Sequence, residues 1–262
     1  MRKHGALPAN NKSAWDELWR SRKRMYVYRN VLTTAELYLE GVAGKTILEV
    51  GCGRGATLRE FARRGAYTFG LDYSEEALEI CRKLHSEDST ILQGTFVNGD
   101  ARSLPFSDSS FDFVFSVGLI EHFEEPAQLL LEQCRVLKPE GHLLVQVPQK
   151  YSLYTIVKKV LIALDKWPYG GWEREYSDRE VVALMKKAEL DPSSVYGYGS
   201  FFLATARYLF LPNLDFGIMW RNGSELKTIR AVKAKTALDI CVVATKTRSA
   251  TPSQREVLLG CQ

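Results

Sequence analysis

Cysteine is scarce in this 262-residue chain and follows no recognisable disulfide or metal-binding pattern. The cysteines number five, which is odd, and no two of them form a C-x-x-C pair. This distribution argues against a disulfide framework and against structural zinc. We therefore expect no metal site and a reducing, cytoplasmic compartment.

Long apolar runs and strong charge are also missing. No stretch approaches the roughly 18 apolar residues of a membrane-spanning helix, and residues 1–8 lack the apolar core of a secretory signal. The net charge of +4 is mild. Because nucleic-acid-binding proteins usually carry a stronger basic patch, we predict that the partner is not a nucleic acid. Residues 1–30 carry eight Lys or Arg against two acids, a local net charge of +6. We favour a solvated helix face there; the alternative is contact with an anionic acceptor or, peripherally, with a membrane surface.

The strongest local signal is an apolar strand that runs into three glycines. Residues 46–50 form the short apolar run of a buried parallel strand, and residues 56–64 form an amphipathic helix that Gly65 ends. Alternate glycines between them allow a sharp turn and the close approach of a ligand. Glu49 stands at the strand's carboxyl end, where a buried carboxylate needs a cationic or hydrogen-bonding partner. The string also fits the dinucleotide fingerprint G-x-G-x-x-A, and a plain tight turn is a third interpretation.

Two further acids follow predicted strands. Asp72 ends the strand at 66–72, 19 residues after Gly53, where a carboxylate accepts hydrogen bonds from ribose hydroxyls. Asp100 ends the strand at 95–101 and is suited to an exocyclic amine such as that of adenine. A simple turn aspartate is the alternative at Asp100. Both acids are compatible with either class of nucleotide cofactor.

Four segments resemble motifs of the Rossmann-like, class I S-adenosylmethionine-dependent methyltransferases, of the small-molecule type found in ubiquinone and menaquinone biosynthesis. They are Ile-Leu-Glu-Val-Gly-Cys-Gly-Arg-Gly (47–55), Asp-Tyr-Ser (72–74), Leu-Pro-Phe-Ser-Asp-Ser-Ser-Phe-Asp (104–112) and Arg-Val-Leu-Lys-Pro-Glu-Gly-His-Leu-Leu-Val (135–145). The third string is the most distinctive, because dinucleotide enzymes do not usually carry it. The resemblance covers residues 44–147 well and the last strand moderately.

The resemblance implies an α/β fold with a three-layer, doubly wound sheet of seven strands, mostly parallel with an antiparallel last strand. It implies S-adenosyl-L-methionine as cofactor, S-adenosyl-L-homocysteine as product, and in-line methyl transfer to a small molecule. His122, after the strand at 111–117, is the candidate catalytic residue because histidine exchanges protons near neutral pH. A structural role for His122 is the alternative, and adjacent Glu121 is a candidate to orient it. The implied cofactor-binding residues are Glu49, Gly51, Cys52, Gly53, Gly55, Asp72, Tyr73, Asp100, Ala101 and Val117.

We predict a single domain over residues 1–246, followed by a disordered tail at 247–262. Residues 1–43 form an N-terminal helical cap, and 149–177 form an insertion on the acceptor side. The cap aromatics line the cleft or, alternatively, face the core: Trp15, Trp19, Tyr26 and Tyr28. In the insertion, Arg174 is a candidate clamp for an anionic group beside an apolar or stacking wall of Trp167, Tyr169, Trp172 and Tyr176. A lid helix without substrate contact is the alternative.

The remaining pattern predicts helices and strands over much of the chain. Lys158 and Lys159 fall on the polar face of the helix at 151–164, and His142 falls in a turn. The other predicted helices span 34–40, 74–84, 127–137, 178–189, 201–211 and 224–235. The other predicted strands span 143–148, 195–198 and 238–245.

Two other functions compete with methyl transfer. A nicotinamide-dependent oxidoreductase is suggested by the Y-x-x-x-K string from Tyr154 to Lys158, although the string follows the fifth strand instead of the fourth. A catalytically silent protein that binds an adenosyl ligand is the second alternative. The sequence favours a small, apolar or aromatic acceptor and a monomer or homodimer. It leaves open whether oxygen, nitrogen or carbon receives the methyl group.

Overall fold

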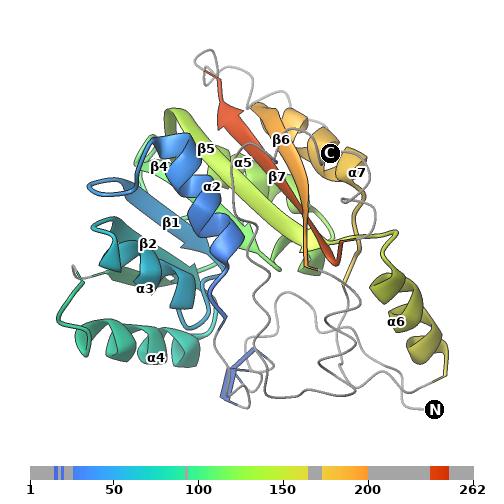
Figure 1. Ribbon diagram of the computed structural model, residues 1–262, viewed down its shortest axis with the longest axis horizontal. Helices are drawn as coiled ribbons and strands as arrows, with labels where there is room; N and C mark the ends of the chain where they lie inside the picture. Colours follow the sequence, from blue (N-terminus) through green and yellow to red (C-terminus); the bar gives the residue numbers. More distant parts are fainter. Residues whose placement is uncertain are drawn as a thin grey trace.

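A seven-stranded sheet organises the molecule (Figure 1). The computed structural model describes residues 15–16, 19–20, 26–91, 94–164, 173–199 and 237–247. The strand order is β3-β2-β1-β4-β5-β7-β6. The strands are β1 (Thr46–Val50), β2 (Tyr67–Asp72), β3 (Thr95–Asn98), β4 (Phe111–Val117), β5 (Leu137–Pro148), β6 (Leu190–Tyr198) and β7 (Asp239–Lys246).

The first five strands are parallel and β7 alone runs the other way. β1 pairs in parallel with both β2 and β4, so Glu49 stands opposite Gly70 on one side and Phe115 on the other. β7 pairs antiparallel with β5 and with β6. The predicted fold class, a mostly parallel doubly wound sheet with an antiparallel last strand, is confirmed.

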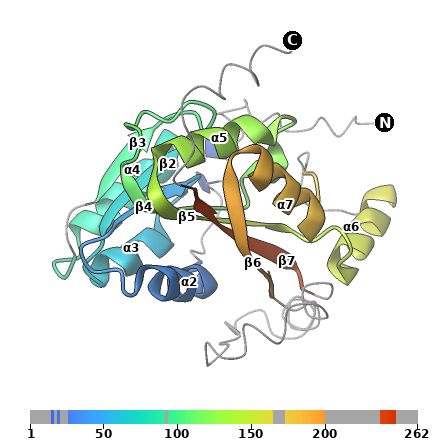
Figure 2. The same ribbon diagram turned by 90° about the horizontal axis from the view of Figure 1, so that it is seen from above.

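Helices cover both faces of the sheet (Figure 2). On one face, α2 and α3 contribute Val31, Leu58 and Phe61 to a core with Phe113 and Phe115. On the other face, α5 and α7 bury side chains such as Leu129 and Met185 against the sheet. α6 stands apart beyond the end of β5 (Figure 1). The helices are α2 (Arg29–Leu39), α3 (Ala56–Arg63), α4 (Glu75–Ser86), α5 (Pro126–Val136), α6 (Leu153–Ala163) and α7 (Asp178–Lys187), with a 3-10 turn η1 (Ile120–His122).

Local chemistry sets several helix starts where the sequence predicted them. The Ser74 hydroxyl accepts a hydrogen bond from the Ala77 amide at the start of α4, and Glu75 and Glu76 place negative charge in its first turn. The Ser177–Glu180 capping box is formed in full at the start of α7. Both predictions are confirmed.

Other boundaries differ from the sequence prediction. α2 begins at Arg29 instead of 34, because Val31 and Leu32 are buried against the sheet and hold an extra helical turn in place. β5 begins at Leu137 instead of 143, and His142 lies within that strand, opposite Phe113 and Thr245. A prediction from local pattern missed these extensions because tertiary packing fixes the start of α2 and strand pairing fixes the start of β5.

Lys158 corrects the predicted polar face of α6. Its side chain is buried, 5% exposed, and its Nζ lies 2.6 Å from Glu173 and 3.3 Å from Glu175. Burial is tolerated because both carboxylates satisfy the ammonium group.

Several predictions fall on residues outside the described part of the chain. These are the helices at 201–211 and 224–235, the aromatic residues Trp167, Tyr169 and Trp172, and the tail at 247–262 apart from Thr247. In the described ranges, no helix has the length and apolarity needed to cross a membrane.

Candidate active site

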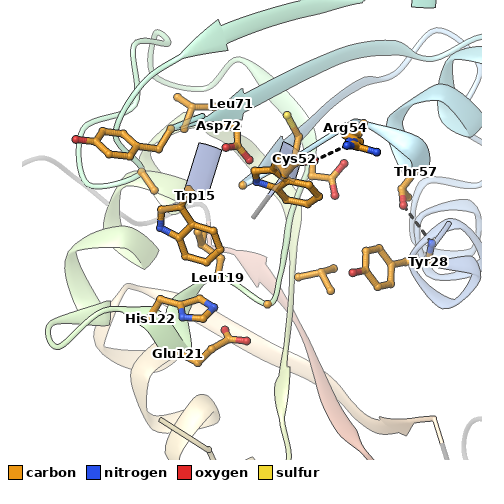
Figure 3. A pocket seen from close by; sticks show the side chains of 18 of the residues that line it. Trp15, Tyr28, Cys52, Arg54, Thr57, Leu71, Asp72, Leu119, Glu121 and His122 are labelled. Carbon is orange, nitrogen blue, oxygen red and sulfur yellow. Dashed lines mark hydrogen bonds between the residues drawn. The ribbon is translucent and has the colours of Figure 1, made fainter. Parts of the chain in front are cut away.

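A cavity of about 310 Å³ opens at the carboxyl ends of β1, β2 and β4 (Figure 3). Glu121 and His122 lie at one end of it, while Asp72 and Cys52 lie at the other (Figure 3). This edge is where open parallel sheets bind ligands, because the loops that leave the strands diverge there.

The glycine turn between β1 and α3 forms one wall of the cavity. Gly51, Gly53 and Gly55 have positive φ angles of 77°, 50° and 65°, a region that side chains rarely adopt. A Cβ on Gly53 would lie 2.4 Å from the Trp19 ring, and one on Gly55 would lie 2.2 Å from the Cys81 sulfur. The turn therefore requires glycine for its conformation and for its packing.

Glu49 is a buried acid with an unused oxygen. Its side chain is 4% exposed and lines the cavity, and its Oε2 has no hydrogen-bond partner. Burial raises the pKa of the Glu49 carboxyl well above its usual range, and nearby Cys81 and Asp72 raise it further. A cationic ligand would satisfy this carboxyl and lower its pKa.

Asp72 joins the glycine turn to α4. Its Oδ2 accepts a hydrogen bond from the Gly53 amide at 2.7 Å, and its Oδ1 accepts one from the Ser74 amide at 2.9 Å. Burial raises the pKa of Asp72 even though these amides act to lower it. A carboxylate has about four acceptor sites, so the two amides leave room for further donors such as hydroxyls.

Asp100 is already part of an ion pair. Its carboxylate contacts the Arg102 guanidinium, with Oδ2 2.5 Å from Nη2. Hydrogen bonds from Arg102 lower the pKa of Asp100 and keep it charged. The pair lines the cavity through Asp100 and holds that carboxylate in a fixed orientation.

Nine of the ten residues implied as cofactor-binding line this one cavity, and Gly53 does not. Gly53 instead supplies the amide that holds Asp72 and lies against the Trp19 ring. The amides of Gly51 and Cys52 donate to the Leu71 carbonyl, so the turn has fewer available donors than its sequence predicted. The nine are Glu49, Gly51, Cys52, Gly55, Asp72, Tyr73, Asp100, Ala101 and Val117.

The N-terminal segment covers the cavity. All four cap aromatics line it, namely Trp15, Trp19, Tyr26 and Tyr28, which favours the cleft interpretation over the core-facing one that the sequence favoured for each residue. Asp16 accepts a hydrogen bond from the Ser74 hydroxyl, and Arg20 pairs with Glu76 on α4 at 2.7 Å. Arg54 donates to the Trp19 carbonyl. These contacts attach the segment to the glycine turn and to α4.

His122 and Glu121 lie at the other end of the cavity. The His122 ring meets the edge of Trp15, with 5.0 Å between ring centroids. Glu121 is 2% exposed and lines the cavity. No motif singled out Glu173, which lines the cavity from within the predicted insertion at 149–177.

Two insertion residues do not occupy the predicted acceptor wall. Tyr176 is fully buried in the core, and its hydroxyl reaches the Ile120 carbonyl at 3.5 Å. Arg174 stacks over Tyr176 and pairs with Glu180. Neither residue lines the cavity, because Tyr176 packs in the core and Arg174 is held by Glu180.

The cavity suits a positively charged ligand. Five acids line it, and Arg54 is the one Arg or Lys among the described lining residues. The acids are Glu49, Asp72, Asp100, Glu121 and Glu173. A ligand with a cationic group and vicinal hydroxyls would fit this set of acceptors, because Glu49 has an unpartnered oxygen and Asp72 has room for further donors.

Comparison with known proteins places this chain among methyltransferases. Residues 48–145 match the family described as a methyltransferase domain. The fatty-acid O-methyltransferase of Mycolicibacterium smegmatis is 33% identical over 175 residues, which cover 66% of this chain and 54% of that protein. The ubiquinone biosynthesis O-methyltransferase of Acinetobacter baylyi is 27% identical over 68% of this chain and 76% of that protein. The chain spans about half the length of the first curated relatives that it matches.

Solved structures share the fold. Magnesium protoporphyrin IX methyltransferase from Synechocystis, with S-adenosylhomocysteine bound, has a TM-score of 0.60 at 13% identity, covering 90% of this chain and 95% of that one. The cyclase SpnF has a TM-score of 0.63 at 20% identity, covering 92% and 97%. Because a cyclase shares it, the fold alone does not specify the reaction.

Proposed function

Because this chain belongs to the class I S-adenosylmethionine-dependent methyltransferases, we propose that it transfers a methyl group from S-adenosylmethionine to a small molecule. The observation that carries the proposal is the buried, unpartnered carboxyl of Glu49 beside the glycine turn. A buried carboxyl without a partner is costly. A cationic cofactor in the cavity would remove that cost.

We assign the cofactor contacts as follows. Asp72 accepts the ribose hydroxyls, Tyr73 packs against the adenine, and Asp100 with the Ala101 amide meets the adenine amino group. Gly51, Cys52 and Gly55 allow close approach of the amino-acid end, which Glu49 receives, while Gly53 acts by fixing Asp72. Val117 faces the reacting end. When bound, the cofactor supplies an already activated methyl group, so the chain's task is positioning and exclusion of water.

The acceptor end of the cavity favours an apolar or aromatic small molecule. Trp15 and Leu119 line the cavity near His122 (Figure 3), and apolar and aromatic surfaces of this kind bind flat or apolar groups. Two relatives are named as O-methyltransferases, one for a fatty acid and one for ubiquinone biosynthesis.

We further propose that residues 1–246 act as one domain, with 1–43 as its cap and 149–177 as its acceptor-side insertion. Two contacts support this division. Asp16 and Arg20 bind α4 beside the cavity, and Glu173 reaches the cavity from the insertion.

An oxidoreductase is not favoured. The lysine of the Y-x-x-x-K string, Lys158, is held by Glu173 and Glu175 and does not line the cavity. It therefore has no access to a bound substrate from that position.

Calorimetric titration tests the proposal directly. The purified protein is titrated with S-adenosylmethionine, S-adenosylhomocysteine and NADH, together with Asp72→Ala and, as a matched control, Asp191→Ala on the exposed edge of β6. We expect both adenosyl ligands to bind the wild type and the control, and Asp72→Ala to lose them. Binding of NADH alone would overturn the proposal. Adenosyl binding without methyl transfer to any acceptor in a broad screen would favour a silent binding protein.

A further inference from the structure

Glu121 is a second buried carboxyl with an unused oxygen, at the opposite end of the cavity from Asp72 (Figure 3). It lies in η1, directly after β4, and is 2% exposed. Its Oε1 would lie 3.5 Å from a Cβ on Gly118, so the carboxyl folds back toward the end of β4. Its Oε2 has no hydrogen-bond partner.

The groups around Glu121 are mostly acidic. Glu173 lines the same cavity, and Asp239 at the start of β7 accepts a hydrogen bond from Gln146. Burial raises the pKa of Glu121 well above its usual range, and Glu173 and Asp239 raise it further, while the backbone amide of Glu121 and, more weakly, Lys158 act to lower it. Lys158 itself is committed to Glu173 and Glu175. Tyr176, Arg174 and His122 complete the charged or titratable surroundings.

Other acids near this region have hydrogen-bond partners for their side chains, which distinguishes them from Glu121. Glu180 accepts hydrogen bonds from Ser177 and Lys150, and Asp239 accepts one from Gln146. An acid with a purely structural role would be expected to have such partners, because an unmade buried hydrogen bond is expensive. Glu121 Oε2 is instead buried without a hydrogen-bond partner, in a residue that lines the cavity.

We propose that Glu121 binds the acceptor's reacting group and takes up its proton, which restricts acceptors to neutral hydroxyls or amines and excludes carboxylates. This inference rests on the proposed function. The acceptor O–H or N–H donates to Glu121 Oε2. As the acceptor atom bonds to the methyl carbon, the proton passes to Oε2, and the electron pair of the broken sulfur–carbon bond stays on sulfur.

The charge balance of the cavity supports this step. A cationic cofactor in the same cavity favours ionised Glu121, since opposite charges stabilise each other where water is excluded. Proton uptake by Glu121 then neutralises the carboxylate as the positive charge is lost. A carboxylate acceptor, by contrast, would face both Glu121 and Glu173 with like charge.

His122 then becomes a positioning residue. Its ring packs on Trp15, which is part of the cap. If Glu121 is the base, its burial next to a half-buried His122 is explained.

The first experiment tests proton binding at Glu121 without any ligand. Urea midpoints are measured from pH 5 to pH 8 for the wild type, Glu121→Gln, and the exposed control Glu124→Gln. A carboxyl whose pKa is raised by folding stabilises the fold at low pH and loses that effect as pH rises. The Glu121→Gln midpoint should therefore rise relative to wild type as pH increases, with no such trend in the control. A pH-independent difference would overturn the proposal.

The second experiment tests acceptor chemistry with three probes that share a decyl chain: 4-decylphenol, decylamine and decanoic acid. Calorimetry with S-adenosylhomocysteine first shows that Glu121→Gln binds it within about 3-fold of wild type, so a failed cofactor site is recognised separately. Label from methyl-labelled S-adenosylmethionine should reach the phenol or the amine, and Glu121→Gln should lower that rate by about 10²–10⁴-fold. His122→Asn should have a smaller effect.

Either of two results would overturn the inference. One is preferred methylation of decanoic acid, and the other is a Glu121→Gln rate close to wild type. The inference also fails if a protein that binds S-adenosylhomocysteine methylates none of the three probes, because a raised pKa at Glu121 by itself reports burial and not a role in methyl transfer.

Discussion

Glu49 shows how a single side chain connects the fold to its ligand. Its neighbours on β1, Leu48 and Val50, are fully buried core residues, yet Glu49 lines the cavity and its Oε2 has no hydrogen-bond partner. We predict that Glu49→Gln weakens S-adenosylmethionine binding roughly 10–100-fold, because a hydrogen bond to a charged group contributes about 1.5–3 kcal/mol. Titration calorimetry measures this, with exposed Glu79→Gln on α4 as control. Unchanged affinity would show that Glu49 does not meet the cofactor.

Alanine substitutions at Gly55 and Gly44 distinguish the cost of backbone strain from the cost of a steric clash. Gly55 and Gly44 have similar φ angles of 65° and 73°, but a Cβ on Gly55 would meet the Cys81 sulfur at 2.2 Å, whereas one on Gly44 has nothing within 4 Å. Gly44→Ala should cost about 1–2 kcal/mol of unfolding free energy from strain alone. Gly55→Ala should cost about 1–3 kcal/mol more through overpacking.

The Cys81→Ala background provides the check on that assignment. Removing the sulfur should recover most of the extra cost of Gly55→Ala and none of the cost of Gly44→Ala, since the two sites share no contact. Urea denaturation of the four variants and their parents measures these differences. Equal costs at both glycines in the wild-type background would contradict the packing argument.

At the scale of elements, the capping box of α7 makes a pH-dependent contribution. Burial alone would raise the pKa of Glu180, but hydrogen bonds from Ser177 and Lys150 lower it to about 2. A lowered pKa stabilises the fold above the unfolded value and loses that effect as pH falls toward 2. Ser177→Ala should therefore cost about 1 kcal/mol near pH 7, and less near pH 3. Thermal unfolding of Ser177→Ala and of exposed Arg179→Ala at both values tests this.

Elements defined by local chemistry were predictable, and those defined by distant packing were not. The glycine turn, the Ser74 cap and the capping box of α7 depend on residues within a few positions of one another. The early start of α2 depends instead on the sheet, and Asn30 there donates to Gln146, 116 residues away. Lys158 was misplaced for the same reason, since Glu173 and Glu175 approach it from another segment.

The candidate site also contains residues that local motifs predict and residues that depend on distant packing. Most implied cofactor residues follow directly from motifs at strand ends, and nine of ten line one cavity. The unused oxygen of Glu121 and the approach of Glu173 arise from how η1, α6 and the insertion pack together. No sequence pattern indicates whether a buried acid has found its partners, because the partners come from several elements.

At the scale of the whole molecule, the sign of the charge differs between the chain and its cavity. The chain carries a net charge of +4, while the cavity is lined by five acids with Arg54 as the one Arg or Lys among the described lining residues. Burial raises the pKa of Glu49, Asp72 and Glu121, so in the free protein these carboxyls hold protons to higher pH than usual.

Cofactor binding should therefore release protons. A positively charged ligand stabilises the ionised carboxyls and lowers their pKa values, so binding displaces the protons held at low pH. We predict that the dissociation constant for S-adenosylmethionine falls as pH rises from 5 to 8, and that calorimetry in buffers of different ionisation enthalpy detects net proton release. Glu49→Gln should reduce the number of protons released, while Glu79→Gln should not. Proton uptake on binding would contradict this account, because the ligand would then favour the neutral acids.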